Sequence, residues 1–213
     1  MRPCFKIRAA TAADLPVLQK LIERSGVKLS AGFYTPEQAH AVTRDVFGVD
    51  TQLIRDGTYF AIEDDTRIVA CGGWSKRSTP YGGDQHKVAP DRLLDPVTEP
   101  AKIRAFFVDP GMERQGLGSM LMQHCTLHAL AAGFTSLELT ATMPGVPLYR
   151  AHGFVSVHDL SLSLGSGQVT VPLTLMRKRS DNWKATGSLT RAVPAYKTAR
   201  AFLRLPSPSK MRC

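Results

Sequence analysis

The stretch VDPGMERQGLGSMLM, residues 108–122, constrains the fold most strongly, because it places Gly116 and Gly118 between an extended apolar run and a run of helix formers. The β-rich run KIRAFFV (102–108) leads into this turn, and a second β-rich run, SLELTAT (136–142), follows the helix. Two strands joined by a helix form a parallel crossover, whereas a hairpin turn joins antiparallel strands. The turn therefore predicts an α/β fold with a parallel pair of strands in its sheet.

The remaining segments add helices and hairpins to this unit and make the sheet mixed. Apolar residues at helical spacing indicate the helices, and alternating apolar and polar residues indicate the strands. Residues 76–100, with four prolines and a Gly-Gly pair, predict a long loop. The expected helices are 11–25, 36–48, 119–132 and a short one within 147–154, and the expected strands lie in 5–11, 58–75, 102–108, 136–142 and 155–178.

Length and charge predict one domain, residues 1–180, followed by a basic tail, residues 181–213. The chain has 213 residues and 43% hydrophobic content, enough for one core. Its net charge of +9 comes from the C-terminal end, because residues 177–213 hold ten Lys or Arg residues and one acid, whereas residues 1–176 hold 17 of each sign. A nucleic-acid surface needs its charge on a face of the fold, so this distribution argues against nucleic acid as a partner.

Cysteine usage and hydropathy indicate the setting of the protein. The four cysteines lie far apart in the sequence, so neither a zinc site nor a disulfide framework is predicted. The N-terminus lacks the apolar region of a signal peptide, and no apolar run approaches the roughly 20 residues that span a bilayer. We therefore expect a cytoplasmic protein that needs no metal and has no membrane partner.

The glycine turn has the composition of a phosphate-binding site. The first amides of a helix have no intrahelical partner and carry partial positive charge, so an anion is stabilised there, and glycines let it approach the backbone. A P-loop is excluded, because Leu117 stands where that motif requires lysine. The dinucleotide motif G-x-G-x-x-G is also incomplete, because Leu121 replaces its third glycine. The alternative is that the glycines only shape a tight turn.

Two motifs in the same order resemble the GNAT superfamily of acyl-CoA N-acyltransferases. FFVDPGMERQGLGSMLM resembles the family's strand, V-x-P and [QR]-x-x-G-x-[GA] turn, and LYRAHGF resembles its L-Y-x-x-x-G-F helix. The resemblance implies a mixed, mostly antiparallel twisted sheet with one parallel strand pair splayed around the coenzyme, flanked by helices. Two departures stand out. Glu113 replaces the usual Gln or Arg, and TMPGVP (142–147) replaces a segment in which many members have a coenzyme-binding Asn.

The resemblance also implies a set of site residues, with acetyl-CoA as the acyl donor. Tyr149 would be the general acid, and Glu138 the general base; Asp84, His86 or a chain of waters are the alternatives for the base. Phe33, Tyr34 and Trp74 would line the acceptor pocket, with Asp84 or Glu99 available to bind an amine. The implied coenzyme-binding residues are Phe106, Phe107, Val108, Arg114, Gln115, Gly116, Leu117, Gly118 and Ser119.

Three functions are compatible with these residues. The first is an N-acetyltransferase for a primary amine of a small molecule, in a monomer or a homodimer. The second is acetylation of a protein N-terminus or lysine, which would require an open groove in place of a lidded pocket. The third is a non-catalytic acyl-CoA sensor whose basic tail contacts a partner. The presence of Tyr149 favours an enzyme, since a sensor needs no general acid.

Overall fold

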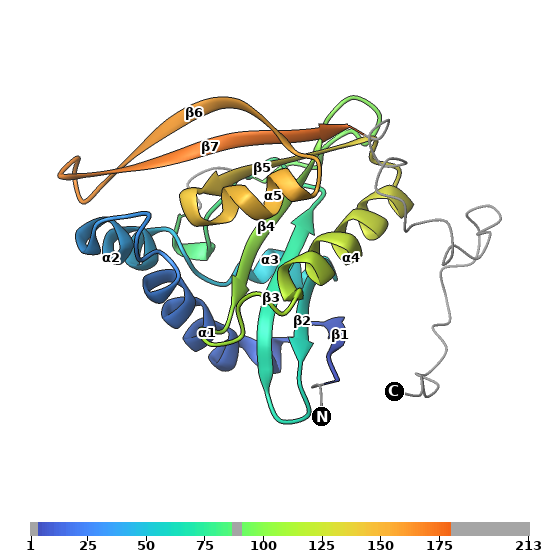
Figure 1. The fold of residues 1–213 in the computed structure, drawn as a ribbon. Helices are drawn as coiled ribbons and strands as arrows, with labels where there is room; N and C mark the ends of the chain where they lie inside the picture. The colour runs from blue at the N-terminus through green and yellow to red at the C-terminus, as the bar shows by residue number, and fades with distance from the viewer. Residues whose placement is uncertain (1–3, 87–90, 180–213) are drawn as a thin grey trace.

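The computed structural model describes residues 4–86 and 91–179, which form one twisted seven-stranded sheet with helices on both faces (Figure 1). The strand order is β1-β2-β3-β4-β5-β7-β6, and every neighbouring pair is antiparallel except β4 and β5. This confirms the predicted mixed sheet with one parallel pair. The strands are β1 (Lys6–Ala9), β2 (Tyr59–Glu63), β3 (Ile68–Ser75), β4 (Ala101–Val108), β5 (Ser136–Thr142), β6 (Val155–Leu164) and β7 (Val169–Arg179).

The parallel pair is short, and this creates the opening in the sheet. Strands β4 and β5 pair only at Ala101 with Leu137 and at Lys102 with Glu138, and then they separate. Within β4, Ala105 has a positive φ of 53°, opposite a register shift in β3. A bulge of this kind bends the strand and turns each side chain after it to the face opposite the one it would otherwise occupy. As a result, the end of β4 leaves its edge toward β5 without a strand partner.

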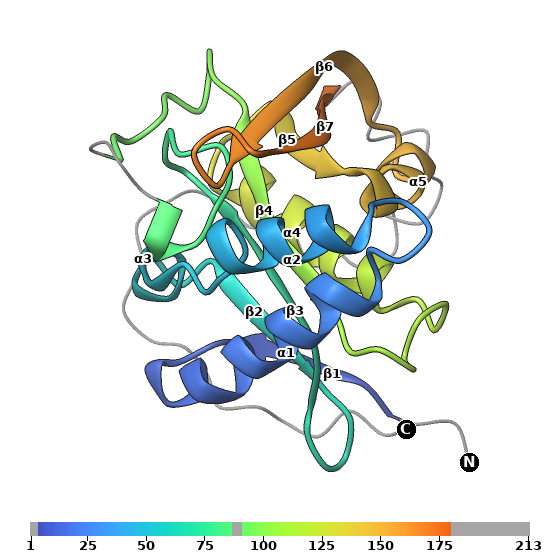
Figure 2. The same ribbon diagram turned by 90° about the vertical axis from the view of Figure 1, so that its left-hand side faces the viewer.

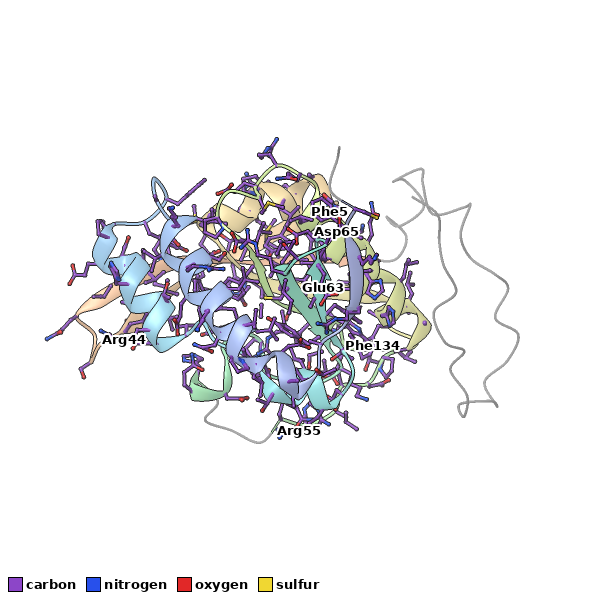
Figure 3. The ribbon with its side chains drawn as sticks, turned by 90° about the horizontal axis from the view of Figure 1, so that it is seen from below. Phe5, Arg44, Arg55, Glu63, Asp65 and Phe134 are labelled. Carbon is purple, nitrogen blue, oxygen red and sulfur yellow. The ribbon has the colours of Figure 1, made fainter. Side chains whose placement is uncertain are left out.

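The helices form a layer on each face of the sheet. Figure 2 shows α1 and α2 crossing in front of the sheet, with α4 behind it. Figure 3 shows side chains filling the space between the layers, with Arg44 and Arg55 at the outer surface. One apolar cluster packs α4 and α5 on the sheet, a second packs α1, and a third joins α2 to β6 and β7. The helices are α1 (Leu15–Lys28), α2 (Pro36–Asp45), α3 (Thr51–Arg55), α4 (Leu117–Ala131) and α5 (Val146–Ala151).

The structure departs from the sequence expectations at one segment and shows what holds another in place. Helix α3 was not predicted, because its five residues are too few to show a helical period; Asp50 caps it by accepting from the Gln52 amide at 3.0 Å. The segment predicted as a loop is held by a bridge between Arg77 and Leu93 and by the ion pair of Arg77 with Asp56. The predicted basic tail lies outside the described residues. Among the helices of the described ranges, none is long and apolar enough to cross a bilayer.

Candidate active site

The turn between β4 and α4 exposes the first amides of α4. Gly116 is the N-cap of α4 with φ +85°, a conformation that residues with a side chain rarely adopt. The first helical bond runs from Met120 N to Gly116 O at 2.9 Å, so the amides of residues 117–119 precede the helical ladder. A Cβ built at Gly116 would meet nothing within 4 Å. The N-terminus of α4 is therefore open to a ligand and suited to an anion.

A buried carboxylate anchors the start of this turn. Asp109 directly follows β4, and its amide donates to Val69 O at 2.8 Å. One carboxylate oxygen, Oδ2, accepts from Arg24 of α1 at 2.6 Å and from Arg67 of the β2–β3 hairpin at 2.9 Å. Because the Asp109 side chain is only 6% exposed, these two guanidinium groups balance a largely desolvated charge. The turn is thus tied to two elements from the N-terminal half of the chain.

Two charged residues inside the turn, Glu113 and Arg114, lie in different surroundings. The Glu113 carboxylate turns back and accepts from the Gly111 amide at 2.7 Å, so it shapes the loop. Arg114 is exposed and has a positive φ of 60°. The turn therefore carries one cation and one anion beside the open amides of α4, and the acid stands where the related motif has Gln or Arg.

Gly118, the second glycine of the turn, lies close to α5. A Cβ at this position would lie 2.9 Å from Leu148 Cδ2, a contact closer than real Cβ atoms make. Leu148 belongs to α5, directly before Tyr149. Gly118 therefore lies beside Leu148, whereas Gly116 has open surroundings; a part for Gly118 in phosphate binding stays a prediction.

A pocket of about 90 Å³ lies where β4 and β5 separate. Its walls come from α2, from the loop at 80–83 and from the facing edges of β4 and β5, and Leu173 of β7 closes one side. Arg104 also lines it, but its guanidinium is bound to Asp50 at 2.9 Å and to the carbonyl oxygens of Thr79 and Gly82. The other lining residues are Val42, Val46, Phe47, Gly48, Pro80, Tyr81, Gly82, Gly83, Ile103, Ala105, Phe106, Phe107, Thr140, Thr142 and Tyr149.

Tyr149, the predicted general acid, lines this pocket from α5. Its ring packs near Phe154 and Phe106, with centroid distances of 6.1 Å and 6.4 Å. Burial raises the pKa of the phenol above its usual value, and the nearby Cys125 thiol adds a smaller contribution. The phenol therefore stays protonated at neutral pH and can donate a proton or a hydrogen bond.

Glu138, the predicted base, lies at the closed end of the β4–β5 pair, outside the pocket lining. Its carboxylate accepts from Lys102 Nζ and Arg177 Nε, each at 2.5 Å, and only 7% of the side chain is exposed. Burial by itself would raise the pKa of Glu138, but the two hydrogen bonds outweigh burial and lower it. The structure does not bring Glu138 to Tyr149, so we assign it a structural role.

Replacing Glu138 with glutamine should therefore destabilise the fold and leave turnover unchanged. A buried carboxylate that loses its charge leaves two cations unbalanced, which costs about 3 kcal/mol at pH 7. Because the pKa of Glu138 is lowered on folding, its contribution is present above the unfolded pKa of about 4.3 and fades as the pH falls further. Urea denaturation at pH 7 and below pH 4 measures this difference. A drop in kcat for the folded variant would instead return Glu138 to catalysis.

None of the three predicted acceptor residues lines the pocket. Phe33 is 53% exposed in the connection between α1 and α2. Tyr34 is buried; its hydroxyl donates to Pro172 O at 2.7 Å and accepts from the Met143 amide at 3.0 Å. Trp74 packs in the core on the α4 side, with its ring 5.8 Å from that of Phe134. Trp74 therefore serves packing, Tyr34 ties the start of α2 to β7 and to the segment before α5, and Phe33 lies at the surface.

The alternative acids and bases also have structural partners. Asp84 accepts from the Thr51 amide at the start of α3, and Glu99 accepts from Arg92 and from the Asp95 amide. The His86 ring lies beside Tyr81, with centroids 5.3 Å apart. Of these four side chains, only Tyr81 lines the pocket. A general base is therefore not evident among the described pocket residues.

Most residues that line the pocket were not predicted from the sequence. Thr140 and Thr142 could have been found, because they alternate with buried residues in SLELTAT and share the face of Glu138. Phe47, at the end of the α2 segment, packs edge-on against Phe107 with centroids 5.1 Å apart. Its place, like that of Tyr81, depends on long-range packing and leaves no local signal. Within residues 4–86 and 91–179, no cluster of three or more His, Cys, Asp or Glu side chains is arranged to hold a metal ion.

Comparison with known proteins identifies structures with the same fold. No curated protein sequence matches the chain significantly. Among solved structures, a GCN5-related N-acetyltransferase from Rhodopseudomonas palustris is similar, with TM-score 0.60 and 18% identity over 84% of this chain and 96% of the other. The PaiA N-acetyltransferase of Thermoplasma acidophilum, in complex with coenzyme A, has TM-score 0.55 and 12% identity over 83% and 99%. A ribosomal-protein-alanine N-acetyltransferase from Brucella melitensis has TM-score 0.53 and 19% identity over 82% and 99%.

These structural likenesses concern the fold, and the sequence match gives the family. The acetyltransferase (GNAT) family model matches residues 28–154, which is more than half of the chain. The matched span includes the glycine turn, both strands of the splayed pair and Tyr149. The chain therefore belongs to the GNAT family of acetyltransferases.

Proposed function

We propose that the protein is an N-acetyltransferase that moves an acetyl group from acetyl-CoA to a primary amine of a small molecule. The observation that carries this proposal is the pocket at the separation of β4 and β5, with the protonated Tyr149 phenol in its wall. The N-terminus of α4 is linked to the end of α5, because Ser119 Oγ lies 2.9 Å from Nε2 of His152.

The described residues fit coenzyme A. Its pyrophosphate matches the open amides of residues 117–119, and exposed Arg114 adds positive charge beside them. Its pantetheine arm carries amides, which match the edge of β4 at Phe106, Phe107 and Val108 that lacks a strand partner. The complex of the similar PaiA acetyltransferase with coenzyme A supports the same assignment. When bound, acetyl-CoA would supply an activated thioester.

The size of the pocket supports a small acceptor over a protein. Val42 and Val46 of α2 pack in one apolar cluster with Leu164 and Leu173 of the β6–β7 hairpin. This contact packs α2 against the hairpin beside the pocket, and the space left in the pocket is about 90 Å³, which suits a small molecule. The wall combines apolar side chains with Tyr81, Thr140 and Thr142, whose hydroxyl groups give it hydrogen-bonding capacity for the acceptor.

The reaction forms a carbon–nitrogen bond, breaks a carbon–sulfur bond and moves two protons. The neutral amine nitrogen bonds to the thioester carbonyl carbon, and the bond from that carbon to sulfur breaks. Tyr149 donates its proton to the departing sulfur, because its phenol is held protonated by burial. The proton lost from the amine passes to water in the pocket, which later restores the phenol.

The acid in the glycine turn gives a test of the phosphate site. Replacing Glu113 with glutamine should strengthen coenzyme A binding by about twofold to fivefold, as expected for removing an exposed like charge. Glutamine keeps an oxygen that can accept from the Gly111 amide, so the loop should keep its shape. Calorimetric titration at low salt measures the gain, and added salt should reduce it. Weaker binding by the glutamine variant would place the phosphates elsewhere.

The deciding experiment for the function is thiol release from acetyl-CoA with a panel of small amines, amino acids and peptides. We expect turnover with small primary amines and none with peptides. Turnover confined to peptides would favour protein acetylation. Tight coenzyme binding without turnover on any acceptor would favour the non-catalytic sensor.

A further inference from the structure

Ser119 and His152 connect the first turn of α4 to the end of α5. Ser119 occupies the third position of α4, and its Oγ lies 2.9 Å from Nε2 of His152, the residue that follows α5. Elsewhere in α4, Thr126 donates its hydroxyl to the carbonyl four residues earlier, Met122 O, at 2.7 Å. The Ser119 hydroxyl instead bonds outside its own helix, beside the amides open to an anion.

The direction of this hydrogen bond decides what Ser119 can do. Burial lowers the pKa of His152, and the charge of Lys178 on β7 lowers it further, so the ring is neutral at pH 7. A neutral imidazole has one donor and one acceptor nitrogen. If Nε2 accepts, the Ser119 proton points at the histidine; if Nε2–H donates, the Ser119 proton is free for another acceptor.

An anion at the N-terminus of α4 selects between these two arrangements. A phosphate oxygen only accepts hydrogen bonds, so it favours the arrangement in which the Ser119 proton turns toward it. The Nε2–H tautomer of His152 then donates to Ser119 Oγ, and the Ser119 hydroxyl both accepts from His152 and donates to the phosphate. Lys178 supports this arrangement, because its side chain is only 6% exposed and its ammonium lies beside Gly153, next to His152. Its positive charge strengthens an anion site.

We propose that His152 is a positioning residue for the coenzyme: its Nε2–H holds Ser119 Oγ so that the Ser119 hydroxyl donates to a phosphate oxygen of coenzyme A. This inference rests on the proposed function. The residue after α5 would then help to recognise the phosphate, while Tyr149 within α5 donates the proton in the reaction. The residue acts through Ser119 and does not itself contact the acyl group.

The test measures coenzyme A binding by calorimetry for the wild type and for Ser119→Ala, His152→Ala and the double variant. Each single change should raise Kd about tenfold, the size of one hydrogen bond to a charged group. The double variant should be little weaker than either single one, because both remove the same interaction. His152→Gln should restore much of the affinity, since its side-chain amide can also donate. His158→Ala, at an exposed histidine of β6, is the matched control and should bind normally.

A second donor separates phosphate recognition from a general effect on α5. Acetyl-pantetheine carries the thioester but no phosphate, so His152→Ala should leave its kcat/KM unchanged. An equal loss with acetyl-CoA and acetyl-pantetheine would overturn the proposal, as would normal coenzyme affinity in His152→Ala. If the wild type itself fails to bind coenzyme A, the proposed function fails, and that outcome is distinct from a silent His152 variant.

Discussion

Replacing Tyr149 with phenylalanine is expected to lower kcat by about 10²- to 10⁴-fold and to leave coenzyme A affinity unchanged. The change removes one hydroxyl and keeps the ring, so the packing near Phe106 and Phe154 is retained. Without that proton donor, the sulfur would have to leave as a thiolate in a partly apolar pocket. Steady-state kinetics with acetyl-CoA and a small amine, combined with calorimetric Kd values, measure both quantities.

Tyr81→Phe is the matched control for this prediction. It removes a hydroxyl from the wall of the same pocket, but from the loop at 80–83 and not from α5. We expect it to change the KM for the acceptor more than kcat. Because burial raises the pKa of Tyr149, wild-type kcat should not fall near pH 10, where an ordinary phenol ionises. Full activity in Tyr149→Phe would assign Tyr149 to packing alone.

Replacing Gly116 with valine should weaken coenzyme A binding by about 10²-fold or more. Valine is a severe outlier at a positive φ, so the N-cap would shift and the amides of residues 117–119 would no longer converge on a phosphate. Losing two hydrogen bonds to a charged group is enough for an effect of this size. Calorimetric titration of the folded variant measures it.

Gly167→Val is the matched control, because it imposes the same backbone strain away from the turn. Gly167 has φ +88°, no atom lies within 4 Å of its Cβ position, and it sits in the turn between β6 and β7. Both variants should lose similar stability in thermal denaturation, and only Gly116→Val should lose affinity. Equal affinity losses in the two variants would mean that strain, and not the phosphate site, explains the result.

The parts of the fold that could be predicted are those with a local signal. The glycine turn predicted the crossover of β4, α4 and β5. Its flanking segments indicate two strands joined by a helix, and strands joined in this way run parallel. The five-residue α3 had no comparable signal. The ordered conformation of residues 76–100 also had no local signal, because the ion pair that holds it, Arg77 with Asp56, joins side chains 21 positions apart.

The site was predictable where a motif fixed both residue and element, and not where only a residue type was available. Tyr149 lies in the pocket wall, as its motif implied. The resemblance assigned Phe33, Tyr34 and Trp74 to the acceptor pocket by segment, because it places that pocket between the N-terminal helices and the middle strands. Both faces of this sheet are covered, so alternation could not tell which face Trp74 would occupy. Glu138 was placed on the correct face, but the ion pairs that hold it are not readable from spacing.

The two register pairs between β4 and β5 divide the sheet into half-sheets, β1 to β4 and β5 to β7, joined by a narrow seam. Such a seam is the natural place for sub-global opening, since few backbone hydrogen bonds must break for the halves to part. A ligand lying between the separated strands would bridge the halves in the way a missing strand would. Amide protons along the free edge of β4 should therefore exchange with solvent quickly in the empty protein and slowly when a ligand lies between β4 and β5. Ligand binding would then make the two half-sheets open as one cooperative unit.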